Sequence, residues 1–116
     1  MRVLSMAVLL SCNNSSTDSA AEPAVDCSVQ TNWTTVGAPF IYTWCTPCHS
    51  PTLTDLESRQ GAPLGVDLAS IEDVWTHAAG IEANIFAPNP AMPPAGGPTD
   101  DDLAAMADWF ACRLPE

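Results

Sequence analysis

Proline and glycine divide the chain into short segments, and this limits the folds open to it more than any other feature. Residues 86–98, FAPNPAMPPAGGP, hold five Pro and two Gly. They can form neither a helix nor a central strand, because proline lacks the backbone N–H that both need. Residues 50–68 are interrupted in the same way, and no segment sustains the period-2 alternation of a half-buried strand. The sequence therefore predicts a small all-α domain with long Pro/Gly loops.

Three segments between these loops are expected to form helices. A short helix is predicted over 37–48 from the helical spacing of its apolar residues. A second helix is expected to begin after the N-cap Ser70 and to be stopped by Gly80. The last should follow the cap residue Thr99, with Trp109 at the edge of its buried face. The apolar stripes expected to face the core are Phe40, Ile41 and Trp44, then Ile71, Val74, Trp75 and Ala78, then Leu103, Met106, Ala107 and Phe110.

The N-terminal residues predict export. MRVLSMAVLLSC has one positive residue, an apolar run too short to span a membrane, and Cys12. This resembles a bacterial lipoprotein signal, which is cleaved before a cysteine that becomes lipidated; the alternative is an ordinary secretory signal with Cys12 incidental. We expect a signal peptide at 1–11, the lipidated Cys12 and a flexible tether at 12–26, and a folded domain at 27–116. The expected location is the bacterial periplasm, with a lipid anchor in a membrane.

The charge of the chain limits its partners. Three Lys+Arg, all of them Arg, stand against 14 Asp+Glu, giving a formal net charge of −11. Nucleic-acid binding needs a basic face, so this class of function is excluded. The acidity instead favours a protein partner with a basic docking face.

The segment WCTPCH, residues 44–49, carries the chemistry and has two interpretations. W-C-x-P-C is typical of a redox dithiol, and C-x-x-C-H is typical of covalent haem attachment. In the second, Cys45 and Cys48 add across the two vinyl groups of the porphyrin and His49 ligates the iron. A thioether on the opposite face would complete the coordination, and Met92 lies in the stiff loop at 86–98. The alternative for Met92 is a side chain that fills a gap in the core.

Over about residues 37–114 the chain resembles a small class I c-type cytochrome. The resemblance is carried by C-x-x-C-H near the start of the domain, the M-P-P loop and the aromatic C-terminal helix. It implies one covalent haem c held by Cys45, Cys48, His49 and Met92, single-electron transfer and no enzymatic activity. It also implies that the first and last helices cross through apolar side chains. GAPLG resembles the family's G-P-x-L-x-G segment, which assigns the carbonyl of Pro63 to the His49 ring.

Two other interpretations of the motif stay open. An exported thioredoxin-like thiol–disulfide oxidoreductase would use Cys45 as the nucleophile and would need strands after residue 52. A structural metal site could combine Cys45, Cys48 and His49 with His77 or Cys112, although zinc sites usually bring two close ligand pairs and only one exists here.

The remaining candidate residues are two cysteines and one arginine. Five Cys, less one for lipid and two for haem, leave Cys27 and Cys112. In an exported protein these predict a disulfide, with two separate thiols as the alternative. Arg59 is the only base in the interior of the domain sequence. It is expected either to pair with a haem propionate or to lie on the surface near acids.

Overall fold

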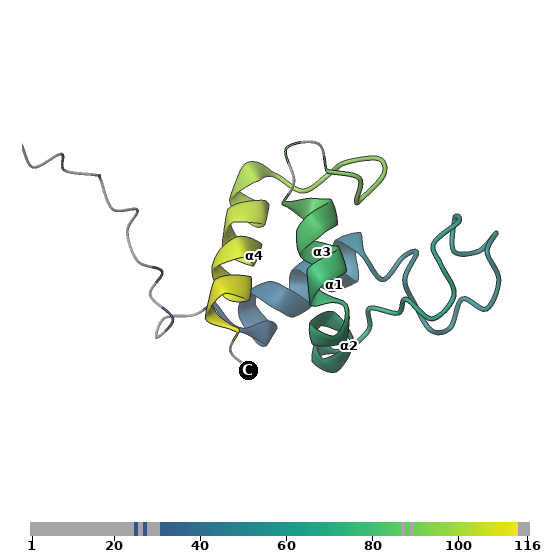
Figure 1. Ribbon diagram of the computed structural model, residues 1–116, viewed down its shortest axis with the longest axis horizontal. Coiled ribbons are helices and arrows are strands. Elements are labelled where there is room, and N and C mark those ends of the chain that lie inside the picture. The colour runs from purple at the N-terminus through teal and green to yellow at the C-terminus, as the bar shows by residue number, and fades with distance from the viewer. Residues whose placement is uncertain (1–24, 26, 28–30, 87, 89, 114–116) are drawn as a thin grey trace, which may run out of the picture.

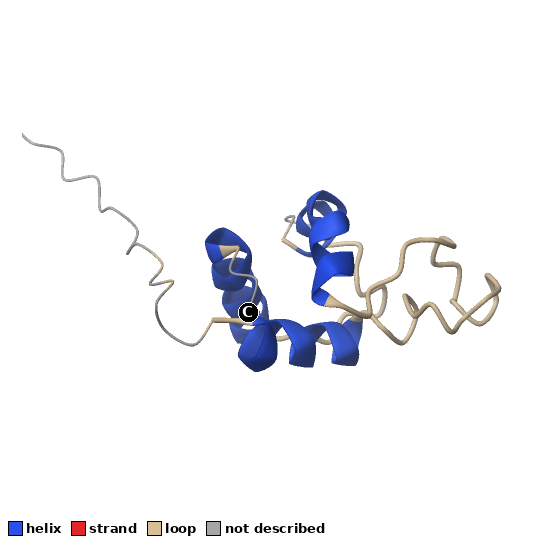
Figure 2. Ribbon diagram, turned by 90° about the horizontal axis from the view of Figure 1, so that it is seen from below, coloured by secondary structure: helices blue, strands red, loops and turns tan. Residues whose placement is uncertain are grey.

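The structure is a computed structural model, and it describes residues 25, 27, 31–86, 88 and 90–113. They form a π-helical turn, η1 (Trp33–Gly37), and the helices α1 (Ala38–Trp44), α2 (Ile71–Thr76), α3 (Ala78–Ile85) and α4 (Asp100–Cys112) (Figure 1). No strand occurs among these residues (Figure 2). The predicted helical class is therefore confirmed, with four α-helices where three were expected. The predicted signal peptide, Cys12 and all but one residue of the predicted tether lie outside the described residues.

The start of α2 and the start of α4 are set by local hydrogen bonds, as predicted. The Ser70 hydroxyl accepts from the N–H of Asp73 at 3.1 Å, and the Asp73 carboxylate accepts from the N–H of Ser70 at 3.0 Å. Thr99 and Asp102 form the same pair of bonds at 3.1 and 2.8 Å. These two capping boxes satisfy N–H groups that have no partner inside a helix.

The prediction that Gly80 stops the second helix is wrong. The helix breaks earlier, at the half-buried His77, and α3 then continues through Gly80 to Ile85. Glycine in a helix costs about 1 kcal/mol relative to alanine, whereas burying an isoleucine side chain contributes about 1.5–3 kcal/mol. Ile81 and Ile85 are both buried in the core, so their burial outweighs the cost of the glycine.

The core forms where α4 packs against η1. Gly37 allows the close approach, since a Cβ there would lie 2.8 Å from Cη2 of Trp109 and 2.7 Å from Cε3 of Trp33. Trp109 is 0% exposed, so its prediction as an edge residue is wrong, as is that of Ala107, which is exposed. The buried apolar residues are Phe40, Ile41, Ala62, Leu68, Val74, Ala78, Ile81, Ile85, Met106, Trp109 and Phe110.

Two connections complete the architecture. The loop between α1 and α2 extends from one side of the helices, on the right in Figure 1. The sulfur atoms of Cys27 and Cys112 lie 2.06 Å apart, which is the distance of a disulfide bond. This pair joins the segment before η1 to the end of α4.

Candidate functional site

The cysteine motif forms one further turn after α1. The N–H of Cys45 donates to the carbonyl of Ile41 at 2.9 Å, and the N–H groups of Cys48 and His49 donate to the carbonyl of Cys45 at 3.1 and 2.9 Å. Residues three and four apart on a helical turn are neighbours, so Cys48 and His49 both lie close to Cys45. Both thiols are free and half-buried.

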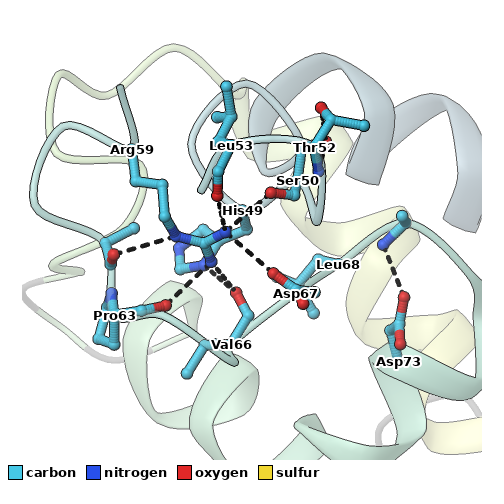
Figure 3. A network of polar contacts seen from close by, with 12 residues as sticks. His49, Ser50, Thr52, Leu53, Arg59, Pro63, Val66, Asp67, Leu68 and Asp73 are labelled. Atoms are coloured by element: carbon cyan, nitrogen blue, oxygen red, sulfur yellow. Dashed lines mark hydrogen bonds and ion pairs between the residues drawn. The ribbon is translucent and has the colours of Figure 1, made fainter. Parts of the chain in front are cut away.

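The ring of His49 is held by a backbone carbonyl. Its Nδ1 lies 2.8 Å from the carbonyl oxygen of Val66 (Figure 3). A carbonyl can only accept, so Nδ1 carries a proton, and in the neutral imidazole the free lone pair is then on Nε2. This is the tautomer that a metal-ligating histidine needs.

The prediction that Pro63 supplies this carbonyl is wrong. The carbonyl of Pro63 accepts instead from Nη2 of Arg59 at 2.9 Å. The oxygen that faces His49 belongs to Val66, three residues further along. The contact therefore forms 17 residues after His49, and Pro63, which lies nearer in the sequence, faces Arg59 instead.

Residues 66–68 lie along the motif and hold its backbone as well as its imidazole. The N–H of Leu68 donates to the carbonyl of His49 at 2.7 Å. The hydroxyl of Thr46 donates to the carbonyl of Leu68 at 2.8 Å. Thr46, Val66 and Leu68 were all missed from the sequence, because two of them act through backbone atoms, which carry no residue-type signal. Thr46 could have been found from its residue type, because it places a hydroxyl donor between the two cysteines.

The side chain of Arg59 donates hydrogen bonds to acceptors along the loop between α1 and α2. Its side chain is 1% exposed, so the expectation of a surface arginine is wrong. The guanidinium has five N–H groups. Within 3.2 Å they meet the carbonyl oxygens of Ser50, Leu53, Ala62, Pro63 and Val66 and a carboxylate oxygen of Asp67 (Figure 3). Every donor is therefore used inside the chain, and the predicted propionate contact would need one of them to change partner.

Met92 is half-buried and packs against the core, as do Trp44 and Cys45. Its N–H donates to the carbonyl of Asn84 at 3.2 Å, which ties the Pro/Gly loop to α3. Further along this loop, the backbone of Gly97 lies so close to Trp44 that a Cβ there would overlap the indole ring. The loop that carries Met92 is thus packed against the residue that precedes Cys45.

The structure disfavours a dithiol catalyst. Burial raises the pKa of the Cys45 thiol to about 12, whereas a nucleophilic cysteine needs a lowered pKa to be a thiolate at neutral pH. The strands that a thioredoxin-like fold requires after residue 52 are also missing from the described part of the chain.

The structural metal site finds no support either. Cys112 is engaged with Cys27, and the residues that the structure describes contain no group of three or more His, Cys, Asp or Glu side chains suited to a metal ion. The donors that are present are of the kinds that covalent haem attachment uses: two free thiols on one turn and an imidazole whose Nδ1 is bonded to a backbone carbonyl.

Comparisons of the chain with protein-family models, curated proteins and solved structures returned no match. Among the described helices, none has the length and apolar character that crossing a membrane would require.

Proposed function

We propose that this protein is a monohaem c-type cytochrome that transfers single electrons. The observation that carries the proposal is the state of the motif at residues 45–49. Two unpaired thiols on one turn adjoin an imidazole whose Nδ1–H is bonded to the Val66 carbonyl. A thiol–disulfide catalyst does not need the hydrogen bond between Nδ1 of His49 and the Val66 carbonyl, whereas an iron-ligating histidine depends on such a bond.

In this proposal Cys45 and Cys48 form the two thioether bonds, and His49 binds the iron through Nε2. Met92, which packs against the same core as Cys45, would supply the second protein ligand. The haem supplies an iron that alternates between the ferrous and ferric states. Thioether ligation and burial raise the reduction potential. With both axial positions filled, no open coordination site remains for a substrate, and we propose no enzymatic activity.

The proposed setting is the periplasmic side of a bacterial membrane. Cys12 would carry the lipid, and residues 12–26 would tether the domain at 27–116. Within the described residues Arg59 is buried and Arg113 donates to Glu82 at 3.4 Å. The exposed charge of the domain is therefore mainly acidic. This supports a redox partner with a basic docking face and an association rate that falls as salt rises.

The test is an optical spectrum of the protein expressed in a periplasm that has haem-attachment machinery. Sharp bands after reduction with dithionite, and haem that stays on the chain in a denaturing gel, are expected. The far-red band of Met–ferric ligation should disappear in Met92→Ala and persist in the matched control Met106→Leu, which alters a buried methionine of α4.

Two results would contradict parts of this proposal. A colourless protein whose Cys45–Cys48 pair exchanges with dithiols would overturn it in favour of the oxidoreductase. Carbon monoxide binding to the reduced wild-type protein at neutral pH would show that Met92 is not bound, which would leave an open-site haem protein such as a sensor or peroxidase.

A further inference from the structure

The carbonyl oxygen of Val66 is shared by two donors. His49 donates to it through Nδ1 at 2.8 Å, and Arg59 donates to it through Nη2 at 2.8 Å. A carbonyl oxygen has two lone pairs, so both bonds can form at once. The arginine and the histidine are therefore joined through a single backbone atom (Figure 3).

Arg59 also determines where that atom lies. On one side its guanidinium holds the carbonyls of Ser50, next to His49, and of Leu53 at 2.8 and 3.1 Å. On the other side it holds the carbonyl of Pro63 at 2.9 Å as well as that of Val66. The guanidinium fork is planar and its donors point in fixed directions, so the two sides of the loop are kept in one relative position.

We propose that Arg59 is a positioning residue that orients His49 through the Val66 carbonyl. The inference rests on the proposed function, since an oriented imidazole matters because it binds iron. Without the guanidinium, the loop backbone at residue 66 loses its tie to residues 50 and 53. The carbonyl then no longer holds the proton on Nδ1, and the ring can change both tautomer and orientation.

The test compares three variants of the full-length chain by ¹H–¹⁵N NMR of the His49 imidazole. Arg59→Gln removes the fork, and Arg59→Lys keeps the charge on one nitrogen that cannot reach both sides of the loop. Arg113→Gln is the matched control, because the side chain of Arg113 is 64% exposed and its ion pair is with Glu82, whose side chain is 42% exposed. In wild type and Arg113→Gln, Nδ1–H should be the single tautomer and exchange slowly with solvent.

In Arg59→Gln and Arg59→Lys we expect exchange of Nδ1–H to be about tenfold faster, which is the upper end of what the loss of one hydrogen bond amounts to, together with signal from the Nε2–H tautomer in the haem-free protein. Wild-type exchange in Arg59→Gln would overturn the inference. So would full rescue by Arg59→Lys, since charge alone would then suffice.

Native-state hydrogen exchange and a comparison of haem-loaded with haem-free protein complete the test. If both Arg59 variants fail to fold, native-state exchange in the wild type replaces them. The Nε–H of Arg59 and the Nδ1–H of His49 should open in one event with the same denaturant dependence, and separate openings would overturn the inference. Exchange of Nδ1–H can be followed with or without haem, whereas the tautomer is informative only without it, because iron bound to Nε2 would fix the proton on Nδ1. A colourless wild type would therefore contradict the proposed function alone, and wild-type Nδ1–H exchange in haem-loaded Arg59→Gln would contradict only the role of Arg59.

Discussion

Gly37 is the position where the packing of α4 on η1 can be tested most directly. A methyl group there would approach Trp33 at 2.7 Å and Trp109 at 2.8 Å, well inside ordinary van der Waals contact. Trp109 cannot turn away, because it is fully buried and its ring centroid lies 4.7 Å from that of Trp75 and 5.5 Å from that of Phe110. Gly37→Ala must therefore push η1 away from α4 or displace the half-buried Trp33.

The expected effect on stability can be worked out from these contacts. Overpacking a core costs about 1–3 kcal/mol. The backbone of Gly37, at φ −60° and ψ −58°, suits alanine, which returns about 0.4–1 kcal/mol by restricting the unfolded chain. We expect Gly37→Ala to lower the free energy of unfolding by about 1–2 kcal/mol.

Gly80 provides the matched control. It lies in α3, it is exposed, and a Cβ there would meet no atom within 4 Å. The same substitution should raise the free energy of unfolding by about 0.5–1 kcal/mol through helix propensity. Urea unfolding followed by tryptophan fluorescence would measure both values. A Gly37→Ala protein as stable as Gly80→Ala would refute the packing of α4 against η1 at this glycine.

Two further predictions concern the ends of α4. Replacing Cys27 and Cys112 by serine should lower the free energy of unfolding by about 4.6 kcal/mol in the chain-entropy model for a separation of 85 residues; equal unfolding midpoints for the variant and the oxidised wild type would show that the bond does not form. Asp102 has a lowered pKa, because its carboxylate accepts from the backbone N–H and then from the hydroxyl of Thr99. The capping box should therefore stabilise α4 above the pKa of aspartate in the unfolded chain and lose this contribution as the pH falls through the lowered folded value. Thr99→Ala removes the hydroxyl and keeps the backbone N–H, so an NMR titration should find the pKa of Asp102 raised only part of the way towards the ordinary range; an unchanged pKa would refute the contribution of the hydroxyl.

Features that depend on near neighbours in the chain could be predicted from the sequence. Ser70 and Thr99 cap their helices because each bonds to an acid three residues later, and such a contact needs no tertiary structure. The proximity of Cys45, Cys48 and His49 follows from their spacing in the same way. The stretches rich in Pro and Gly had to be loops, because proline lacks the N–H that a helix or strand requires and glycine loses the most conformational entropy when it is ordered.

Features that depend on contacts between distant segments could not be predicted. Trp109 is fully buried because η1 offers a glycine at the crossing point, and the pattern of α4 alone places it at an edge. Whether Gly80 ended a helix was decided by the burial of Ile81 and Ile85 against other elements.

The sequence by itself determined the helical class, the loops, the helix caps and the chemical groups of the motif, because covalent spacing and local hydrogen bonds govern all of them. Only the tertiary structure decided which carbonyl faces His49 and where Arg59 lies. Both positions depend on the path of the loop between α1 and α2. That path is fixed by the guanidinium of Arg59, which donates to carbonyls on both sides of the loop, among them those of Ser50 and Val66. Backbone oxygens are chemically alike in every residue, so their position in the fold alone distinguishes Val66 from Pro63.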